Sequence, residues 1–371
     1  MQRKKLISGI IAAAVIAGGA YFAYAHWIGA KGNSRESLLH ALPADATAVI
    51  YMDIAESRQG PMLKNISGWS ADATTDPEYK QFVRETGFDY EKDLNRVGIV
   101  VQNRGATRNY FALADGNFDR KKIEAYLRKN GSVEQKGARE IFYLAASKQG
   151  RTISVSFVSD ERVALTDGDD LSAEIEAGQQ SAGHKEWTER FERLAGSPMF
   201  ALVRQDATIG AAFNARAPGG LRSPQLAQLL NHLLWISIAG KPEGEEFRVV
   251  VEGECPNEAS MRQLADFLNG IALMAQAGLN DPKLRQQMDP ALREAYLQLL
   301  NSADVAKLDR GNSKSVRVVL LFTPEIWAKL ASTQQFAAPA AQPEKKAPDA
   351  VGKESSPKRK KAGTRVPAKH L

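Results

Sequence analysis

This chain of 371 residues contains one cysteine, Cys255, so no disulfide can form within it. Any stability outside the cytoplasm must therefore come from apolar cores. The lack of a cysteine near the N-terminus also excludes the lipid attachment of a bacterial lipoprotein. Because Pro256 follows Cys255 and no histidine lies near it in the sequence, Cys255 is predicted to be a partly buried thiol and not a nucleophile.

Histidine is scarce as well, and the five histidines are widely separated. They are His26, His40, His184, His232 and His370. No H-E-x-x-H motif or other close pair of metal ligands occurs, and a lone histidine such as His232 is more often a packing or surface residue than a catalytic one. The nucleophile elbow G-x-S-x-G, the Walker loop and the dinucleotide-binding fingerprint are also missing. The sequence thus predicts no catalytic residue, no cofactor and no metal site.

The densest acidic cluster is Asp167-Gly168-Asp169-Asp170, with Asp160 and Glu161 nearby. Carboxylates at that density could hold a hard cation such as calcium, but the cluster lacks the spacing of a calcium-binding loop and its distant glutamate. Asp169 or Asp170 stands at the start of a predicted helix, where a carboxylate accepts hydrogen bonds from free backbone N–H groups. Helix capping is therefore favoured over calcium binding.

The N-terminus combines a basic cluster, Arg3, Lys4 and Lys5, with a stretch from Leu6 to Ala30 that has no acidic residue, lysine or arginine. About twenty apolar residues span the hydrocarbon core of a bilayer, and a basic cluster is retained on the cytoplasmic side. Residues 1–30 are therefore predicted to be a signal anchor, a transmembrane helix with its N-terminus in the cytoplasm and the body outside. The alternative is a signal peptide that is cleaved after Ala25 and releases the body.

The positive charge lies at the two ends of the chain, whose formal charge is +6. From Glu344 onward there are nine basic and three acidic residues, and with the N-terminal cluster this leaves the region between with a charge of −3. A mildly acidic body argues against specific nucleic-acid binding. Residues 332–371, rich in alanine, proline and lysine, are predicted to be a disordered tail. This tail either contacts anionic lipids or envelope polymers or is a solvated spacer.

The region between the ends is predicted to form two α+β halves, 31–180 and 181–331. In the first half, segments rich in β-branched and aromatic residues predict strands at 46–54, 97–101, 110–114, 141–145, 153–158 and 163–166. The polar segment between residues 101 and 110 predicts a hairpin. Helices are expected at 77–86, ending at Gly87, from the cap Asp119 to Gly131, and at 171–177.

The second half is predicted to repeat this order. Strands are expected at 199–204, 234–239, 247–252 and 316–322, a turn at 240–244, and helices at 223–230 and from the cap Asn257 through residue 300. The helix after Asn257 is predicted to bury one face from Met261 to Met274. The repeated order predicts two related halves, each an antiparallel sheet covered by helices like a split βαβ unit. The competing interpretation is a chance similarity between two common arrangements.

Four short motifs carry a resemblance to a known family. They are Leu42-Pro43-Ala44-Asp45 before the first strand, Thr86-Gly87-Phe88-Asp89, Lys92-Asp93-Leu94 and Asp115-Gly116-Asn117-Phe118-Asp119. Together with the basic N-terminal anchor, they resemble a family of bacterial membrane-anchored or exported proteins that carry a domain of unknown function. The resemblance covers mainly residues 40–175. It implies such a domain and supplies no catalytic residues.

These observations predict a membrane-anchored extracytoplasmic protein of the bacterial cell envelope that is a binding or scaffolding module and not an enzyme. Its expected partners are the membrane, through the anchor, and other envelope proteins. Two alternatives stay open: an extracytoplasmic hydrolase whose active site no motif reveals, and a secreted or periplasmic protein released by cleavage at Ala25. A cleft of titratable groups with shifted pKa values would favour the hydrolase, whereas an exposed apolar patch without such a cleft would favour partner binding.

Overall fold

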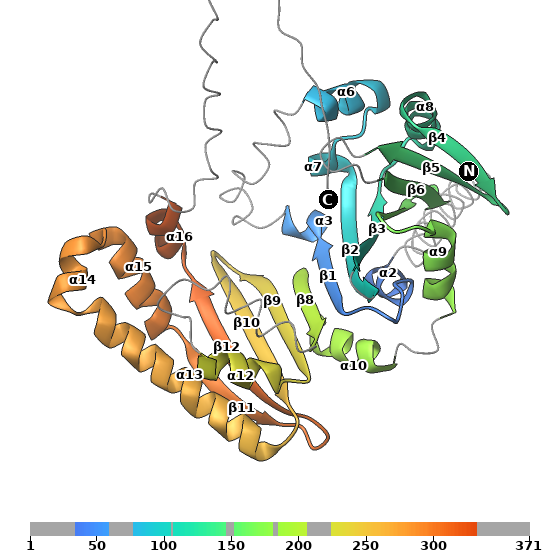
Figure 1. The fold of residues 1–371 in the computed structure, drawn as a ribbon. Helices are drawn as coiled ribbons and strands as arrows, with labels where there is room; N and C mark the ends of the chain where they lie inside the picture. Colours follow the sequence, from blue (N-terminus) through green and yellow to red (C-terminus); the bar gives the residue numbers. More distant parts are fainter. Residues whose placement is uncertain are drawn as a thin grey trace, which may run out of the picture. The chain divides into compact units, whose positions relative to one another are not determined.

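The computed structural model describes residues 34–58, 77–104, 107–145, 152–180, 185–205 and 224–331. In these ranges twelve strands form one continuous sheet in which all neighbouring strands are antiparallel (Figure 1). The strands are β1 (Ala48–Asp53), β2 (Leu94–Arg104), β3 (Thr107–Gly116), β4 (Ser132–Lys136), β5 (Arg139–Ala145), β6 (Thr152–Ser159), β7 (Arg162–Thr166), β8 (Met199–Arg204), β9 (Trp235–Glu243), β10 (Glu246–Cys255), β11 (Asp304–Asp309) and β12 (Lys314–Phe322).

Helices accompany the sheet, which confirms the predicted α+β class. They are α2 (Arg35–His40), α3 (Ile54–Ser57), α6 (Pro77–Thr86), α7 (Tyr90–Asp93), α8 (Arg120–Asn130), α9 (Leu171–Gln179), α10 (Lys185–Arg193), α12 (Pro224–Asn231), α13 (Glu258–Leu279), α14 (Pro282–Gln287), α15 (Pro290–Asn301) and α16 (Pro324–Ala331). The predicted caps are confirmed, since the side chains of Asp119 and Asn257 accept hydrogen bonds from the N–H groups of Lys122 and Ser260.

The order of the strands is β11-β12-β10-β9-β8-β1-β2-β3-β7-β6-β5-β4. From the centre outward, the first half contributes its first three strands and then its last strand, β7. The second half does the same with β8, β9, β10 and its last strand, β12. The first half then continues with β6, β5 and β4, and the second half with β11 alone. The two halves therefore follow the same order until the first half adds further strands.

The predicted split βαβ arrangement holds at one place and fails at another. Because β12 is antiparallel to both β10 and β11, the strands β10 and β11 are parallel and are separated by β12, as in a split βαβ unit. The strands β1 and β2 are also linked through helices, but they pair directly and are antiparallel. The halves also do not form two sheets, since β1 pairs with β8 along residues Ala48–Met52 and Met199–Val203.

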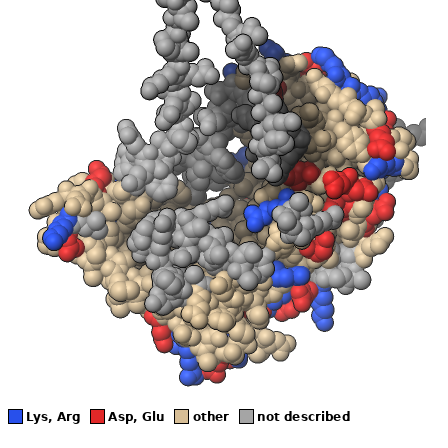
Figure 2. Space-filling model, in the orientation of Figure 1, with Lys and Arg blue, Asp and Glu red and all other residues tan. Residues whose placement is uncertain are grey.

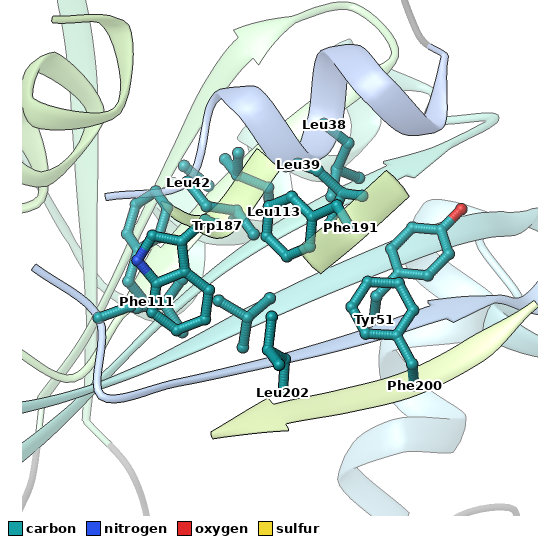
Figure 3. Packing of buried hydrophobic residues seen from close by; sticks show 14 of the residues in the cluster. Leu38, Leu39, Leu42, Tyr51, Phe111, Leu113, Trp187, Phe191, Phe200 and Leu202 are labelled. Carbon is teal, nitrogen blue, oxygen red and sulfur yellow. The ribbon is translucent and has the colours of Figure 1, made fainter. Parts of the chain in front are cut away.

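One hydrophobic core lies over this junction and draws on both halves (Figure 3). On this face of the sheet, which we call the α10 face, Tyr51 of β1 stacks on Phe200 of β8 with ring centres 5.2 Å apart. Leu38 of α2 is buried in the same cluster, as are Trp187 and Phe191 of α10. The segment that opens the first half and the helix that opens the second half thus share a core.

The opposite face, the α13 face, carries separate cores. Under α8, Ile123 and Leu127 pack against side chains of β5, β6 and β7. Under α13, Met261 and Leu264 pack with Cys255 and Val316. These helices follow β3 and β10, the third strand of each half.

Two sequence expectations in the second half are wrong. The turn lies around Gly244, whose φ is +63°, and not at 240–244, because β9 extends to Glu243. Met274 is not buried but 68% exposed, and uncharged surface lies along α13 between the charged groups at its ends (Figure 2). Met274 follows Met261 by thirteen residues, which at 3.6 residues per turn places the two side chains on nearly opposite sides of the helix.

The predicted anchor (1–30), the cleavage site and the basic tail (332–371) lie outside the described residues and stay predictions. Of the helices within the described ranges, none has both the length and the apolar character that a bilayer span requires.

The shared core predicts that the two halves unfold together. We expect Phe200→Ala to lower the free energy of unfolding by about 3–5 kcal/mol, because a large buried ring is removed. Urea unfolding followed by circular dichroism and by tryptophan fluorescence should give one coincident transition for both the wild type and this variant. Ile238→Ala, at a 45% exposed position on the other face, is the control and should change stability far less. Two separate transitions would contradict the prediction.

Candidate functional site

A pocket of about 210 Å³ lies on the α10 face of the second half, between α10 and the strands β8, β9, β10 and β12. It is lined mainly by charged side chains over a floor of strand residues. Among the described lining residues, four are arginines and two are glutamates, an excess of two positive charges: Arg190, Arg193, Arg310, Arg317, Glu252 and Glu254.

The alternation of β10 creates the floor of this pocket. Successive side chains of a strand point to opposite faces, so Glu252 and Glu254 lie on the α10 face while Cys255 belongs to the core under α13. The pairing of β10 with the strands on either side then determines which side chains lie next to Glu252. Glu252 lies opposite Ser237 on one side and Arg317 on the other, which places a row of polar side chains across the sheet.

Glu254 is held by the two arginines of α10. Arg190 donates to it through Nε at 3.2 Å and Nη2 at 2.8 Å, and Arg193 donates through Nη1 at 3.4 Å. The guanidinium of Arg190 also lies 4.0 Å from the ring centre of Trp235, a cation–π contact. Because Glu254 is nearly buried, these charge-assisted hydrogen bonds offset the cost of removing its carboxylate from water.

Glu252 is held by a residue from the turn between β11 and β12. Arg310 donates to both carboxylate oxygens, at 2.5 and 2.9 Å, and the hydroxyl of Ser315 donates at 2.8 Å. Burial alone would raise the pKa of Glu252, but the hydrogen bonds from Arg310 and Ser315 outweigh it and lower that pKa. The same pair raises the pKa of Arg310. The carboxylate of Glu252 is thus fixed in its ionised form.

Arg317 has no such partner. Its Nε atom is buried and donates no hydrogen bond to a described residue, and no described residue forms an ion pair with its guanidinium. The strand register places Arg317 directly opposite Glu252, but the carboxylate is taken by Arg310. The guanidinium of Arg317 therefore lines the pocket without a neutralising contact in the described part of the chain.

The first half contains the corresponding pair of residues, and there the two side chains form an ion pair. Asp115 of β3 lies opposite Arg162 of β7, just as Glu252 of β10 lies opposite Arg317 of β12. Arg162 donates hydrogen bonds to both carboxylate oxygens of Asp115, at 2.6 and 2.9 Å, and to the hydroxyl of Ser37 at 3.2 Å. Both partners are buried. At equivalent strand positions, the first half has a satisfied arginine and the second half has an unsatisfied one.

The structure assigns structural roles to the sequence candidates that it describes. Cys255 is 3% exposed, and burial, followed by the nearby charge of Glu254, raises the pKa of its thiol to about 11. A thiol of that kind stays protonated at neutral pH, and Cys255 is more deeply buried than the partly buried position that the sequence predicted. His40 and His232 lie on the surface at the end of α2 and beside α12, and His26, His184 and His370 lie outside the described residues.

The acidic cluster caps a helix, as predicted. Asp170 accepts hydrogen bonds from the N–H groups of Ser172 and Ala173 at the start of α9, and Asp167 accepts one from the N–H of Tyr110 at 2.7 Å. Within the described ranges, no group of histidine, cysteine, aspartate or glutamate side chains is arranged to hold a metal ion.

One signal for the pocket is present in the sequence, outside any known motif. Arg317 interrupts an otherwise apolar run within β12, from Val316 to Phe322, and Glu252 and Glu254 alternate in the strand beside it. Burial of a charged side chain is costly unless the charge is paired and hydrogen-bonded, so a charge on a buried face of a sheet points to a partner or a ligand. The arginines of α10 gave no such signal, because Arg190 and Arg193 resemble ordinary solvated residues of a helix.

Comparison of the sequence with protein-family models and with curated proteins yields no match. Among solved structures, the fold is similar to two crystal forms of the protein TP0453. Crystal form I gives a TM-score of 0.43 at 10% identity, covering 81% of this chain and 98% of that one. Crystal form III gives a TM-score of 0.42 at 10% identity, covering 80% of this chain and 98% of that one. Such values are too low to transfer a function.

The contrast between the two arginines predicts opposite effects of the same substitution. We expect Arg162→Met to lower the free energy of unfolding by about 3–5 kcal/mol, because it leaves the buried carboxylate of Asp115 unpaired. Arg317→Met should leave stability unchanged or raise it by about 1 kcal/mol, because it removes a buried nitrogen that has no hydrogen bond. Urea unfolding of both variants measures the difference.

Arg262→Met on α13 is the matched control for this pair. Arg262 is exposed and pairs with Glu258 on the same helix, so its loss should cost less than about 1 kcal/mol. Equal destabilisation by Arg162→Met and Arg317→Met would contradict the view that Arg162 has a partner among the described residues and Arg317 has none.

Proposed function

We propose that the protein is a membrane-anchored extracytoplasmic binding module of the bacterial cell envelope, and that the pocket on the α10 face holds its ligand. The observation that carries the proposal is the pocket itself, in which charged side chains line a hollow over the sheet. Ligand sites are typically concave, formed before binding and equipped with a few well-oriented polar groups.

The ion pairs around the pocket support binding more than acid–base chemistry. Glu252 and Glu254 are each held by arginines and do not have to reorganise when a ligand enters. A general acid at neutral pH needs a raised carboxyl pKa, but the pKa of Glu252 is lowered by Arg310 and Ser315. The carboxylates thus position the surrounding arginines, and a proton-donating role is not favoured for Glu252.

The membrane part of the proposal rests on the sequence of residues 1–30 and on the start of the fold. Only four residues, 31–34, separate the predicted span from α2, and Leu38 and Leu39 of α2 are buried in the shared core. An extended chain of four residues reaches about 14 Å. With the anchor retained, the body would therefore stay close to the outer surface of the membrane.

We also propose that the two halves are related by duplication of one unit. Three features support this: the common strand order from the centre outward, the helices α8 and α13 after the third strand of each half, and the opposed pairs at positions 115/162 and 252/317. In this view the second half still has an acidic residue and an arginine at the positions of the buried pair, but Arg317 no longer binds the carboxylate, which pairs with Arg310.

Occupation of the pocket in the envelope tests the binding proposal. A photoreactive amino acid in place of Ser197, which lines the pocket, should form an adduct with a small molecule or partner when whole cells are irradiated. Mass spectrometry of the peptide around residue 197 measures the adduct. The same amino acid at Arg262 is the control and should give none. No adduct at residue 197 in the folded protein would overturn the proposal.

Cleavage at Ala25 decides between the anchored and the released protein. We expect the wild type and Ala25→Leu, which blocks a small-x-small cleavage site, each to keep the mass of its own uncleaved chain and to resist extraction from membranes by alkaline carbonate. N-terminal sequencing and extraction measure this. A wild-type protein that begins at His26 and is released, beside an Ala25→Leu variant that stays with the membrane, would show that the segment is a signal peptide.

A further inference from the structure

We infer that the pocket binds a small organic anion, whose carboxylate or phosphate group is held by Arg317 and whose short apolar part packs on Val250 and Ala239. The inference rests on the proposed function, because it names the ligand class of the same pocket. It is carried by three independent features: the charge that remains unpaired, the layout of polar and apolar rows on the sheet, and the size of the pocket.

The charge balance points to an anion. Arg190 and Arg193 are engaged with Glu254, and Arg310 is engaged with Glu252. Arg317 remains, with a buried Nε atom that has no hydrogen-bond partner among the described residues. A guanidinium presents a planar fork of donors that fits the two oxygens of a carboxylate or phosphate group. An anion at this point would supply the contact that Asp115 supplies to Arg162 in the first half.

The sheet places an apolar wall next to this arginine. Arg317, Glu252 and Ser237 form one row across the strands, and Val250 and Ala239 form the next row on the same face. Two residues along a strand correspond to about 7 Å. A ligand with its anionic group on Arg317 therefore has its other end over Val250 and Ala239, where an apolar group is favoured.

The size of the pocket favours an occupant larger than a bare ion. A cavity that holds a single water has a volume on the order of 10–15 Å³, and the volume of the pocket on the same measure is about 210 Å³. The described charged residues of the lining have an excess of two positive charges, which suits a ligand with one or two negative charges. These limits favour a compact molecule with one anionic group and a short apolar body.

Ligand-detected NMR titration of the full chain in lipid nanodiscs tests the inference. Pentanoate and butyl phosphate are the organic probes, inorganic phosphate is the bare ion, and pentanol is the uncharged control. We expect pentanoate, butyl phosphate or both to bind, inorganic phosphate to bind at least tenfold more weakly, and pentanol not to bind. The two organic probes show whether the site prefers a carboxylate or a phosphate group.

Arg317→Gln should weaken binding of the organic anions at least tenfold, and Arg262→Gln, with the same change of charge on the surface of α13, should leave it unchanged. Thermal melting at or above the wild-type temperature shows that Arg317→Gln is folded. The inference is overturned if neither organic anion binds to the wild type, if Arg317→Gln binds them as tightly, or if inorganic phosphate or pentanol binds equally well.

The outcome separates this inference from the proposed function. If the adduct at residue 197 contains a neutral or cationic compound, the pocket is a binding site but its ligand is not an anion, and only the inference fails. If no adduct forms, the binding proposal fails, whatever the model anions do in solution.

Discussion

The antiparallel pairing of β1 with β8 is the interaction on which the rest of the structure depends. It joins the first strand of each half, so that neither half presents an open edge at the centre of the sheet. Tyr51 and Phe200 face each other across this pair, and Phe191 of α10 lies 5.8 Å from Phe200. The junction therefore fixes α10 above the second half of the sheet, where α10 forms one wall of the pocket.

The core and the pocket share a boundary at Trp235. The ring of Trp187 meets the ring of Trp235 edge to face at 4.8 Å and ties it to the core, while Arg190 stacks on Trp235 at 4.0 Å. Because Trp187 and Arg190 are three residues apart on one helix, the same turn of α10 both anchors the helix and places its charge. Packing at the junction thus determines where the guanidinium of Arg190 lies, and hence the ion pair with Glu254.

Local signals in the sequence predicted much of the fold. Helices with a cap, such as those after Asp119 and Asn257, and strands with β-branched runs lie close to their predicted bounds. The strand β4 was missed because its residues, 132–136, are almost all exposed and show no apolar alternation. The single sheet could not be predicted, since the pairing of β1 with β8 joins residues about 150 positions apart. The pocket depends on the same long-range pairing.

The state of Arg317 shows why this site lies beyond local sequence reasoning. Its strand neighbour Glu252 would suffice as a partner, as Asp115 does for Arg162. What releases Arg317 is Arg310, seven residues earlier, which reaches the same carboxylate from the turn between β11 and β12. An unpartnered buried nitrogen costs stability, and proteins retain such costs mainly where function requires them. The competition between two arginines for one glutamate therefore leaves a charge that no residue in the described part of the chain neutralises, and an anion can.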